Sequence, residues 1–501
     1  MLGCWRSNKD YQSFVLTKLK ALAEIFPESV LEYKDSISKM LILNLDPLKD
    51  IITPLYSLTG RPAEMQPEIF RSLILMNDLG IQLDNWTEKL RLNPVLRTIA
   101  GFTLDNLVNT SSYYDFINRI IRLDERPRLK KIKFKPKEKL KKGEKLPPKN
   151  PGIVAKIVNQ IINNNDKFIE QLARRPERFL QKIFAKVCVS KSIEIEIVPD
   201  SVSISGDGTC IETGASPSGV KVCNCKEEGN FRCTCDRKFS DPNATWGWDS
   251  HKEINFYGYT GYFISTYNKS LKMDLPLYLR LVEASRHDSV SAVFALAEFR
   301  ELYPDLQIDT FISDSASDNY ATYELLNHGG INAVIALNSK NTGNYKYPPA
   351  LHINDNGVPV CPGGYEMIFN GFCKDRCRFK WRCPCVLGKA EPCEACQNCS
   401  PSSYGRVIYT KPDWDLRLFT RIPRGSDAWK LKMKERTAAE RVNNRILNDY
   451  GIEKAKQRGK KRISFFTTIA GFNIHLDAQL KKLTADNQFD FYQIFNINKA
   501  A

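Results

Sequence analysis

The segment Ile308-Asp-Thr-Phe-Ile-Ser-Asp314 is the part of the sequence that decides the fold. Its apolar residues predict a buried strand, and that strand ends in a carboxylate. A helix is predicted directly after it at 319–327, with Asp318 as a plausible N-cap, and a second apolar strand follows at 333–337. Since ligands bind beyond the carboxyl ends of strands in α/β sheets, Asp314 lies where we expect chemistry.

Outward from this segment the sequence alternates between strand-like and helix-like patterns. The pattern predicts strands at 193–198, 202–211 and 254–267, a helix at 289–302, a strand at 406–409 and a long basic helix at about 426–448. Residues 1–126 show helical periodicity, and no strand-like alternation of any length occurs there. Mixed strands followed by alternating helices and strands predict an α/β (mixed α+β) fold class.

Changes in composition divide the chain into seven segments. These are a helical N-terminal region (1–126), a Lys/Pro-rich linker (127–151), a helical connector (152–191), the first part of the α/β domain (192–340), a Cys-rich insertion (341–405), the second part of the α/β domain (406–480) and a C-terminal tail (481–501). The linker has too few apolar residues to pack.

Basic charge is concentrated in two runs. The chain has 73 Lys+Arg against 57 Asp+Glu, a formal net charge of +16. The run at 128–149 holds 11 basic and 2 acidic residues, and the run at 430–462 holds 12 basic and 4 acidic residues. Either run could be a solvated surface, but two of them favour nucleic acid as the partner. We expect Lys130, Lys131 and Lys133 in the first run to bind phosphates without reading sequence.

Three carboxylates stand out by their placement. Asp207 lies within a predicted strand between two glycines, which would let a ligand approach the backbone. Asp314 ends a strand, and Glu440 lies four residues after Arg436 on one face of the basic helix. Together they could hold two Mg²⁺ ions, which clamp the attacking and leaving oxygens of a phosphoryl transfer. Each alone could equally be a cap, an ion-pair partner or a surface charge.

Twelve of the 15 cysteines fall into two clusters. Clustered cysteines of an intracellular chain more often bind metal than form disulfides, and structural zinc needs four such ligands. Unligated thiols remain an alternative for both clusters, and iron–sulfur ligation for the second. The first cluster is Cys223, Cys225, Cys233 and Cys235; the second is Cys361, Cys373, Cys377, Cys383, Cys385, Cys393, Cys396 and Cys399.

Several short strings resemble those of bacterial insertion-sequence DDE transposases. Residues 311–325 (FISDSASDNYATYEL) are similar to the region of the second aspartate, and residues 204–211 (ISGDGTCI) to the strand of the first. Residues 434–445 (KERTAAERVNNR) resemble the glutamate helix of the family. Other strings that match the family are Leu58-Thr-Gly-Arg-Pro, Trp246-Gly-Trp-Asp-Ser-His-Lys, Ser285-Arg-His-Asp-Ser289 and, for the Cys-rich insertion of some members, Cys361-Pro-Gly-Gly.

The resemblance implies an RNase-H-like catalytic domain in which Asp207, Asp314 and Glu440 bind Mg²⁺. It also implies a helical DNA-binding domain at the N-terminus, cleavage of double-stranded DNA at transposon ends, strand transfer into target DNA and a homodimer on that DNA. Asp318 is the alternative for the second aspartate. A catalytically inactive DNA-binding relative, or a nuclease without strand transfer, would share the same fold.

The glutamate helix departs from the family pattern at two positions. Many relatives carry a tyrosine and a lysine where this chain has Met433 and Leu447. Arg436, Arg441 and Arg445 are therefore our candidates for contacts with transposon-end DNA.

The sequence predicts an intracellular protein. The longest uncharged runs are 15 residues and contain many polar residues, so no membrane span is predicted. The N-terminus lacks the apolar stretch of a secretory signal. For a bacterial transposase this implies a cytoplasmic protein associated with the nucleoid.

Overall fold

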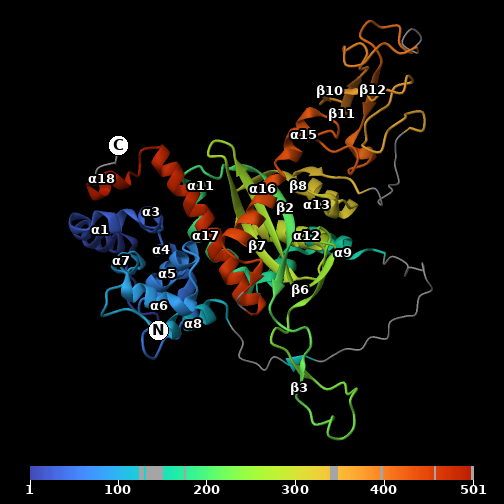
Figure 1. Cartoon of the computed structure of the whole chain (residues 1–501). Helices are drawn as coiled ribbons and strands as arrows, with labels where there is room; N and C mark the ends of the chain where they lie inside the picture. Colours follow the sequence, from blue (N-terminus) through green and yellow to red (C-terminus); the bar gives the residue numbers. More distant parts are fainter. Residues whose placement is uncertain are drawn as a thin grey trace.

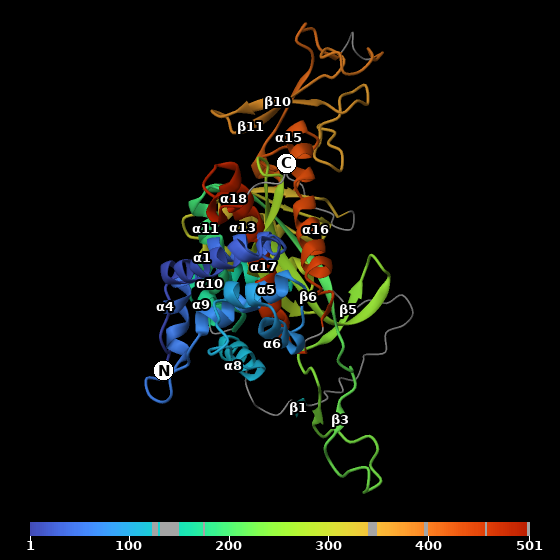
Figure 2. The same cartoon turned by 60° about the vertical axis from the view of Figure 1, so that its left-hand side comes forward.

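A computed structural model of the chain describes residues 1–122, 129–130, 150–173, 176–338, 348–394, 399–455 and 458–497. It shows a mixed sheet flanked by helices, a helical region at one side, and two extensions that project away from the sheet (Figures 1 and 2). The mixed α/β class expected from the sequence is therefore confirmed.

The central sheet combines parallel and antiparallel pairs. Strand β2 (Ser201–Thr213) lies between β6 (Ile254–Asn268), which is antiparallel to it, and β8 (Gln307–Ser313), which is parallel. Strand β9 (Asn332–Ile335) continues the parallel side, while β5 (Thr245–Asp249) and β7 (Met273–Glu283) both pair with β6. A short strand β13 (Lys454–Ala455) pairs with the end of β2. The strands predicted at 202–211, 254–267, 308–314 and 333–337 are all present within a few residues.

Helices cover both faces of this sheet. Helix α12 (Asp288–Leu302) reaches β2 at Gly208, and α16 (Thr437–Asn444) reaches it at Asp207. Since neighbouring strand residues point to opposite faces, the two helices lie on opposite sides of the sheet. Helices α9 (Ile153–Ala173) and α13 (Tyr320–His328) pack together, and α9 also packs on α12. Helix α13 begins after Asn319, whose side chain accepts from the backbone N–H of Thr322 at 3.0 Å.

The N-terminal helices share one hydrophobic core with the sheet. Helix α17 (Lys460–Ala485) packs on β7 and also on α3 and α5. Phe70 of α5 contacts the rings of Phe465 and Phe472 of α17 at centroid distances of 6.4 and 5.5 Å. The helices of this region are α1 (Asn8–Ile25), α2 (Pro27–Leu31), α3 (Lys34–Ile42), α4 (Asp46–Ile52), α5 (Gln66–Asp78), α6 (Leu83–Leu92), α7 (Pro94–Ala100) and α8 (Thr110–Ile120).

The Cys-rich insertion forms a separate small sheet. Its strands are β10 (Ile368–Cys373) and β11 (Arg378–Arg382), and β12 (Val407–Thr410), just beyond the predicted end of the insertion, pairs with β11 instead of joining the central sheet; all are antiparallel. Its own core includes Phe379, Trp381 and Ile408. Alternate residues of β11 and β12 supply this buried face.

The prediction of a strand at 193–198 is wrong. Helix α11 (Ser190–Glu194) continues into a turn, where the backbone N–H groups of Ile197 and Val198 both donate to the carbonyl of Ser192. Glu196 takes a left-handed conformation with φ of +57°. The alternating isoleucines therefore mark the end of a helix, at which Ile197 is fully buried, rather than an extended strand.

Two further boundaries differ from the prediction. The basic helix at 426–448 is divided into α15 (Asp427–Lys434), α16 and a final π-helical turn, Arg445–Asp449. The expected boundary at residue 480 falls inside α17, and the following helix α18 (Phe491–Phe495) has both terminal phenylalanines buried. Among the described residues, no helix is long and apolar enough to cross a membrane.

Candidate functional site

Asp207 and Asp314 lie on adjacent parallel strands. Asp207 is on β2, and Asp314 directly follows β8, which pairs with β2 at Ser205. The amide of Asn443 on α16 donates to Asp207 Oδ2 at 3.0 Å. Asp314 begins a short 3₁₀ turn, and its Oδ1 accepts from the backbone N–H of Ala316 at 3.0 Å. One carboxylate oxygen of Asp314 is therefore fixed by the backbone.

Glu440, the third carboxylate predicted from the sequence, lies on a helix rather than at a strand. It lies on α16, and its carboxylate pairs with Arg436 one turn earlier at 2.6 Å. Asp207, Asp314 and Glu440 all line one open cavity of about 1000 Å³. The structure thus brings the three sequence-predicted carboxylates to the same cavity.

A fourth carboxylate, Asp288, lines this cavity and was not singled out from the sequence. It is the first residue of α12, and its side chain lies directly against Gly208, where a Cβ atom would collide with it. The glycine after Asp207 therefore makes room for a protein carboxylate rather than for a ligand, contrary to the expectation. The string Ser285-Arg-His-Asp-Ser289 was the sequence signal that could have identified Asp288.

Burial and neighbouring carboxylates raise the pKa values of two members of this group, Asp207 and Asp288. Burial, followed by the negative charges of Asp314 and Asp288, raises the pKa of Asp207 to about 7. Burial and the charge of Asp314 likewise raise the pKa of Asp288 to about 6. Buried like charges without a counter-ion are a high-energy arrangement, and a divalent cation would relieve it. Carboxylate oxygens are the ligands that Mg²⁺ prefers. Among the described residues, however, no three of these carboxylates have oxygens within 4.8 Å of one another, so magnesium at this site stays a prediction.

Asp318 has a structural role, so it is a poor alternative for the second aspartate. Its side chain is fully buried and accepts three hydrogen bonds from the guanidinium of Arg417, the shortest at 2.7 Å. It also accepts from the hydroxyl of Tyr323 at 2.9 Å and from the backbone N–H of Asn338 at 2.6 Å. Asn319, rather than Asp318, caps the following helix.

The three arginines proposed for DNA contacts each have a carboxylate partner within the chain. Arg436 pairs with Glu440, Arg441 with Asp274 at 2.7 Å, and Arg445 with Asp477 at 2.7 Å. DNA phosphates would have to compete with these partners, so the assignment stays a prediction. Of the linker lysines, Lys130 lies in the short strand β1 (Leu129–Lys130), whereas Lys131 and Lys133 lie outside the described residues.

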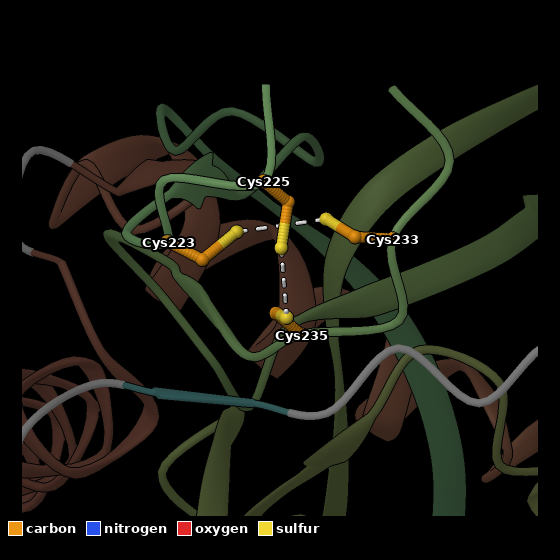
Figure 3. A group of neighbouring side chains, drawn as sticks. All are labelled: Cys223, Cys225, Cys233 and Cys235. Carbon is orange, nitrogen blue, oxygen red and sulfur yellow. Dashed lines mark hydrogen bonds between the residues drawn. The ribbon is translucent and has the colours of Figure 1, made fainter. Parts of the chain in front are cut away.

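The first cysteine cluster converges to a single point (Figure 3). Its four residues lie in a loop between two short paired strands, β3 (Val220–Lys221) and β4 (Arg237–Lys238). The sulfur atoms all lie within 4.8 Å of one another, and the Cys223–Cys233 and Cys225–Cys235 pairs are each 3.5 Å apart. Gly229 forms the turn at the end of the loop with φ of +79°. This cluster could bind a metal ion.

Hydrogen bonding gives the thiols of this cluster different pKa values. A hydrogen bond involving the Cys225 backbone, together with the neighbouring thiols, lowers the pKa of Cys223 to about 7. The thiols of Cys235 and Cys223 raise the pKa of Cys225 to about 12. Because one thiolate disfavours a second beside it, full deprotonation of the cluster requires a cation at its centre.

The second cluster does not converge in the same way. Among its seven cysteines in the described part of the chain, no three sulfur atoms lie within 4.8 Å of one another, and Cys396 lies outside that part. Cys361 and Cys383 are buried in the insertion, and the thiol of Cys385 contacts the carbonyl of Glu391 at 3.1 Å. Metal binding at this cluster therefore stays a prediction from the sequence.

Comparison with known proteins adds no family assignment. No family model matches the chain, and no curated protein matches it either. The interpretation of the site therefore depends on the geometry of its own residues.

Proposed function

We propose that the chain is a DDE transposase that cleaves DNA at transposon ends and joins them to target DNA. The observation that carries this proposal is the shared cavity lined by Asp207, Asp314 and Glu440, which come from two adjacent strands and a helix. The family resemblance of the strings around these residues supports it, as does the net charge of +16. An RNase-H-like fold of the catalytic domain and association with the nucleoid belong to the same proposal.

Magnesium would be held by Asp207, Asp314 and Glu440, with Asp288 as a further carboxylate within the cavity. When bound, Mg²⁺ activates the attacking oxygen and neutralises charge on the transferred phosphate. Asn443 orients the Asp207 carboxylate, and Arg436 orients that of Glu440. Lys252 and Arg286 also line the cavity, but each pairs with a glutamate, Lys252 with Glu453 at 3.0 Å and Arg286 with Glu283 at 3.8 Å.

The test is an assay for strand joining. Purified protein, Mg²⁺ and a DNA carrying the inverted repeats that flank the coding sequence should give cleavage at the repeat ends, followed by joining of the new 3′-hydroxyl to a second DNA. Cleavage without joined product would indicate an RNase-H-like nuclease. Binding without cleavage would indicate a catalytically inactive relative.

Zinc is our proposal for the metal at Cys223, Cys225, Cys233 and Cys235. Zinc–thiolate bonds of about 2.3 Å place tetrahedral sulfurs about 3.8 Å apart, close to the 3.5 Å separations of the two pairs. The role would be structural, because Phe231 and Val222 in this loop are exposed at 64% and 53% and give it little core.

We expect about one tightly bound zinc per chain at this site. Changing Cys225→Ser and Cys235→Ser together should remove it and open residues 222–236 to protease, whereas Cys373→Ser with Cys377→Ser should not. Elemental analysis and mapping of the protease cuts measure both effects. Absence of zinc from protein purified without chelator, or disulfides linking Cys223 to Cys233 and Cys225 to Cys235, would contradict the assignment.

A further inference from the structure

One face of the insertion sheet carries three cations in a row. Along β11, Phe379 and Trp381 are each 2% exposed and lie in the core of the insertion. Arg378, Lys380 and Arg382 alternate with them and therefore point to the opposite face. The alternation in the string RFKWR thus separates an apolar face from a basic one.

Two tyrosine rings hold these cations in place. The guanidinium of Arg378 lies 3.6 Å from the ring centroid of Tyr409, which pairs with Lys380 across β11 and β12. The guanidinium of Arg382 lies 3.5 Å from the centroid of Tyr404, and the Lys380 ammonium donates to the Tyr404 hydroxyl at 2.7 Å. We call these five residues the basic sheet face.

The fold does not neutralise this charge. In the parts of the chain that the structure describes, no carboxylate forms an ion pair with Arg378, Lys380 or Arg382. Arg417 and Arg441, by contrast, each have an aspartate partner. Since the tyrosines already restrict the side chains, an external anion would bind with little further loss of conformational entropy.

The arrangement suits a repeating anion better than a single one. Alternate residues of a strand are about 6.6 Å apart, a separation comparable with that of successive phosphates along one nucleic-acid strand. Arginine forks pair well with phosphate oxygens, and each neutralised phosphate releases counter-ions.

The insertion is connected along the chain to the helix that carries Glu440. The insertion leaves the sheet after β9 and returns through α15 to α16, which carries Glu440. Arg424 attaches the segment that follows the insertion to the sheet, because its guanidinium donates to the carbonyl of Ile335 in β9 at 2.6 Å. Figures 1 and 2 show the insertion as an extension beyond the sheet, where it could contact DNA outside the cavity.

We infer that the basic sheet face binds the phosphate backbone of duplex DNA alongside the segment held in the cavity. The inference deepens the proposed function, since it takes DNA to be the substrate. In this inference the insertion strengthens DNA binding and takes no part in the chemical steps. The basic sheet face binds DNA without reading the base sequence.

The test uses the full chain and a labelled duplex of mixed sequence, with binding followed by fluorescence anisotropy over a series of salt concentrations. The triple change Arg378→Gln, Lys380→Gln and Arg382→Gln should weaken binding about tenfold or more at moderate salt. It should also make the slope of log affinity against log salt shallower by roughly 2 to 3. Tyr404→Ala, which keeps every charge, should give a smaller loss. Circular dichroism checks that each variant folds.

A matched control removes three exposed cations from helical surfaces elsewhere, through Lys182→Gln, Lys186→Gln and Arg300→Gln. An equal loss in this control, wild-type affinity in the first variant, or tighter binding to single-stranded RNA than to the duplex would each overturn the inference. Asp207→Asn protein should bind like the wild type. If the wild-type protein neither cleaved nor joined DNA, the proposed function would fail while the binding comparison stood.

Discussion

Asp207→Asn should lower DNA cleavage by more than about 10³-fold while leaving DNA binding unchanged. Asp207 lies on β2 at the wall of the cavity, and an amide would remove one negative ligand from the group that we expect to hold Mg²⁺. Gel analysis of cleaved ends and anisotropy with uncleaved DNA measure the two properties separately.

The melting temperature of the Asp207→Asn protein distinguishes loss of catalysis from simple unfolding. Because burial and neighbouring charges raise the pKa of Asp207, replacing it with a neutral amide relieves repulsion from Asp314 and Asp288. The variant should therefore melt at the same temperature as the wild type or higher. Retained cleavage would remove Asp207 from the site.

The neighbouring aspartates provide the controls for this assignment. Asp314→Asn should match Asp207→Asn, and Asp288→Asn should also reduce cleavage if it contributes to the cation site. Normal cleavage by Asp314→Asn, combined with loss in a folded Asp318→Asn protein, would show that Asp318 is the second catalytic aspartate after all.

Arg417→Met should destabilise the junction between the insertion and the sheet by about 3–5 kcal/mol, because it leaves Asp318 buried without its charge partner. The side chains of Arg417 and Asp318 are only 4% and 0% exposed, so water cannot take over the interaction. Denaturant-dependent hydrogen exchange in residues 415–424 and 318–326 measures the local loss.

The matched control breaks an exposed ion pair of similar length. Arg91 and Glu88 are 2.8 Å apart but 61% and 57% exposed, so Arg91→Met should cost less than about 1 kcal/mol. Adding Asp318→Asn to Arg417→Met should recover part of the stability, since no buried charge then remains. Equal losses in the two arginine variants would contradict a buried ion pair at Asp318.

Local patterns in the sequence were sufficient for much of the α/β region. The apolar run before Asp314 predicts β8 and places the aspartate at its end, and the periodicity of 289–302 predicts α12. The same reasoning failed at 193–198, where isoleucine alternation coincides with the end of a helix. Two-residue periodicity over so short a run cannot distinguish a strand from a helix that ends with buried residues.

The sequence by itself determined most strands and helices of the α/β region and the cysteine loop, because each depends on residues close together along the chain. Cys223 and Cys235 are separated by only 12 positions, so the turn at Gly229 is enough to bring the thiols together. Only the tertiary structure decided which aspartates share the cavity. Asp288 joins Asp207 because α12 packs over Gly208, and Asp318 is excluded because Arg417, 99 residues away, neutralises it in the core. Such contacts depend on packing between distant segments, which no local periodicity records.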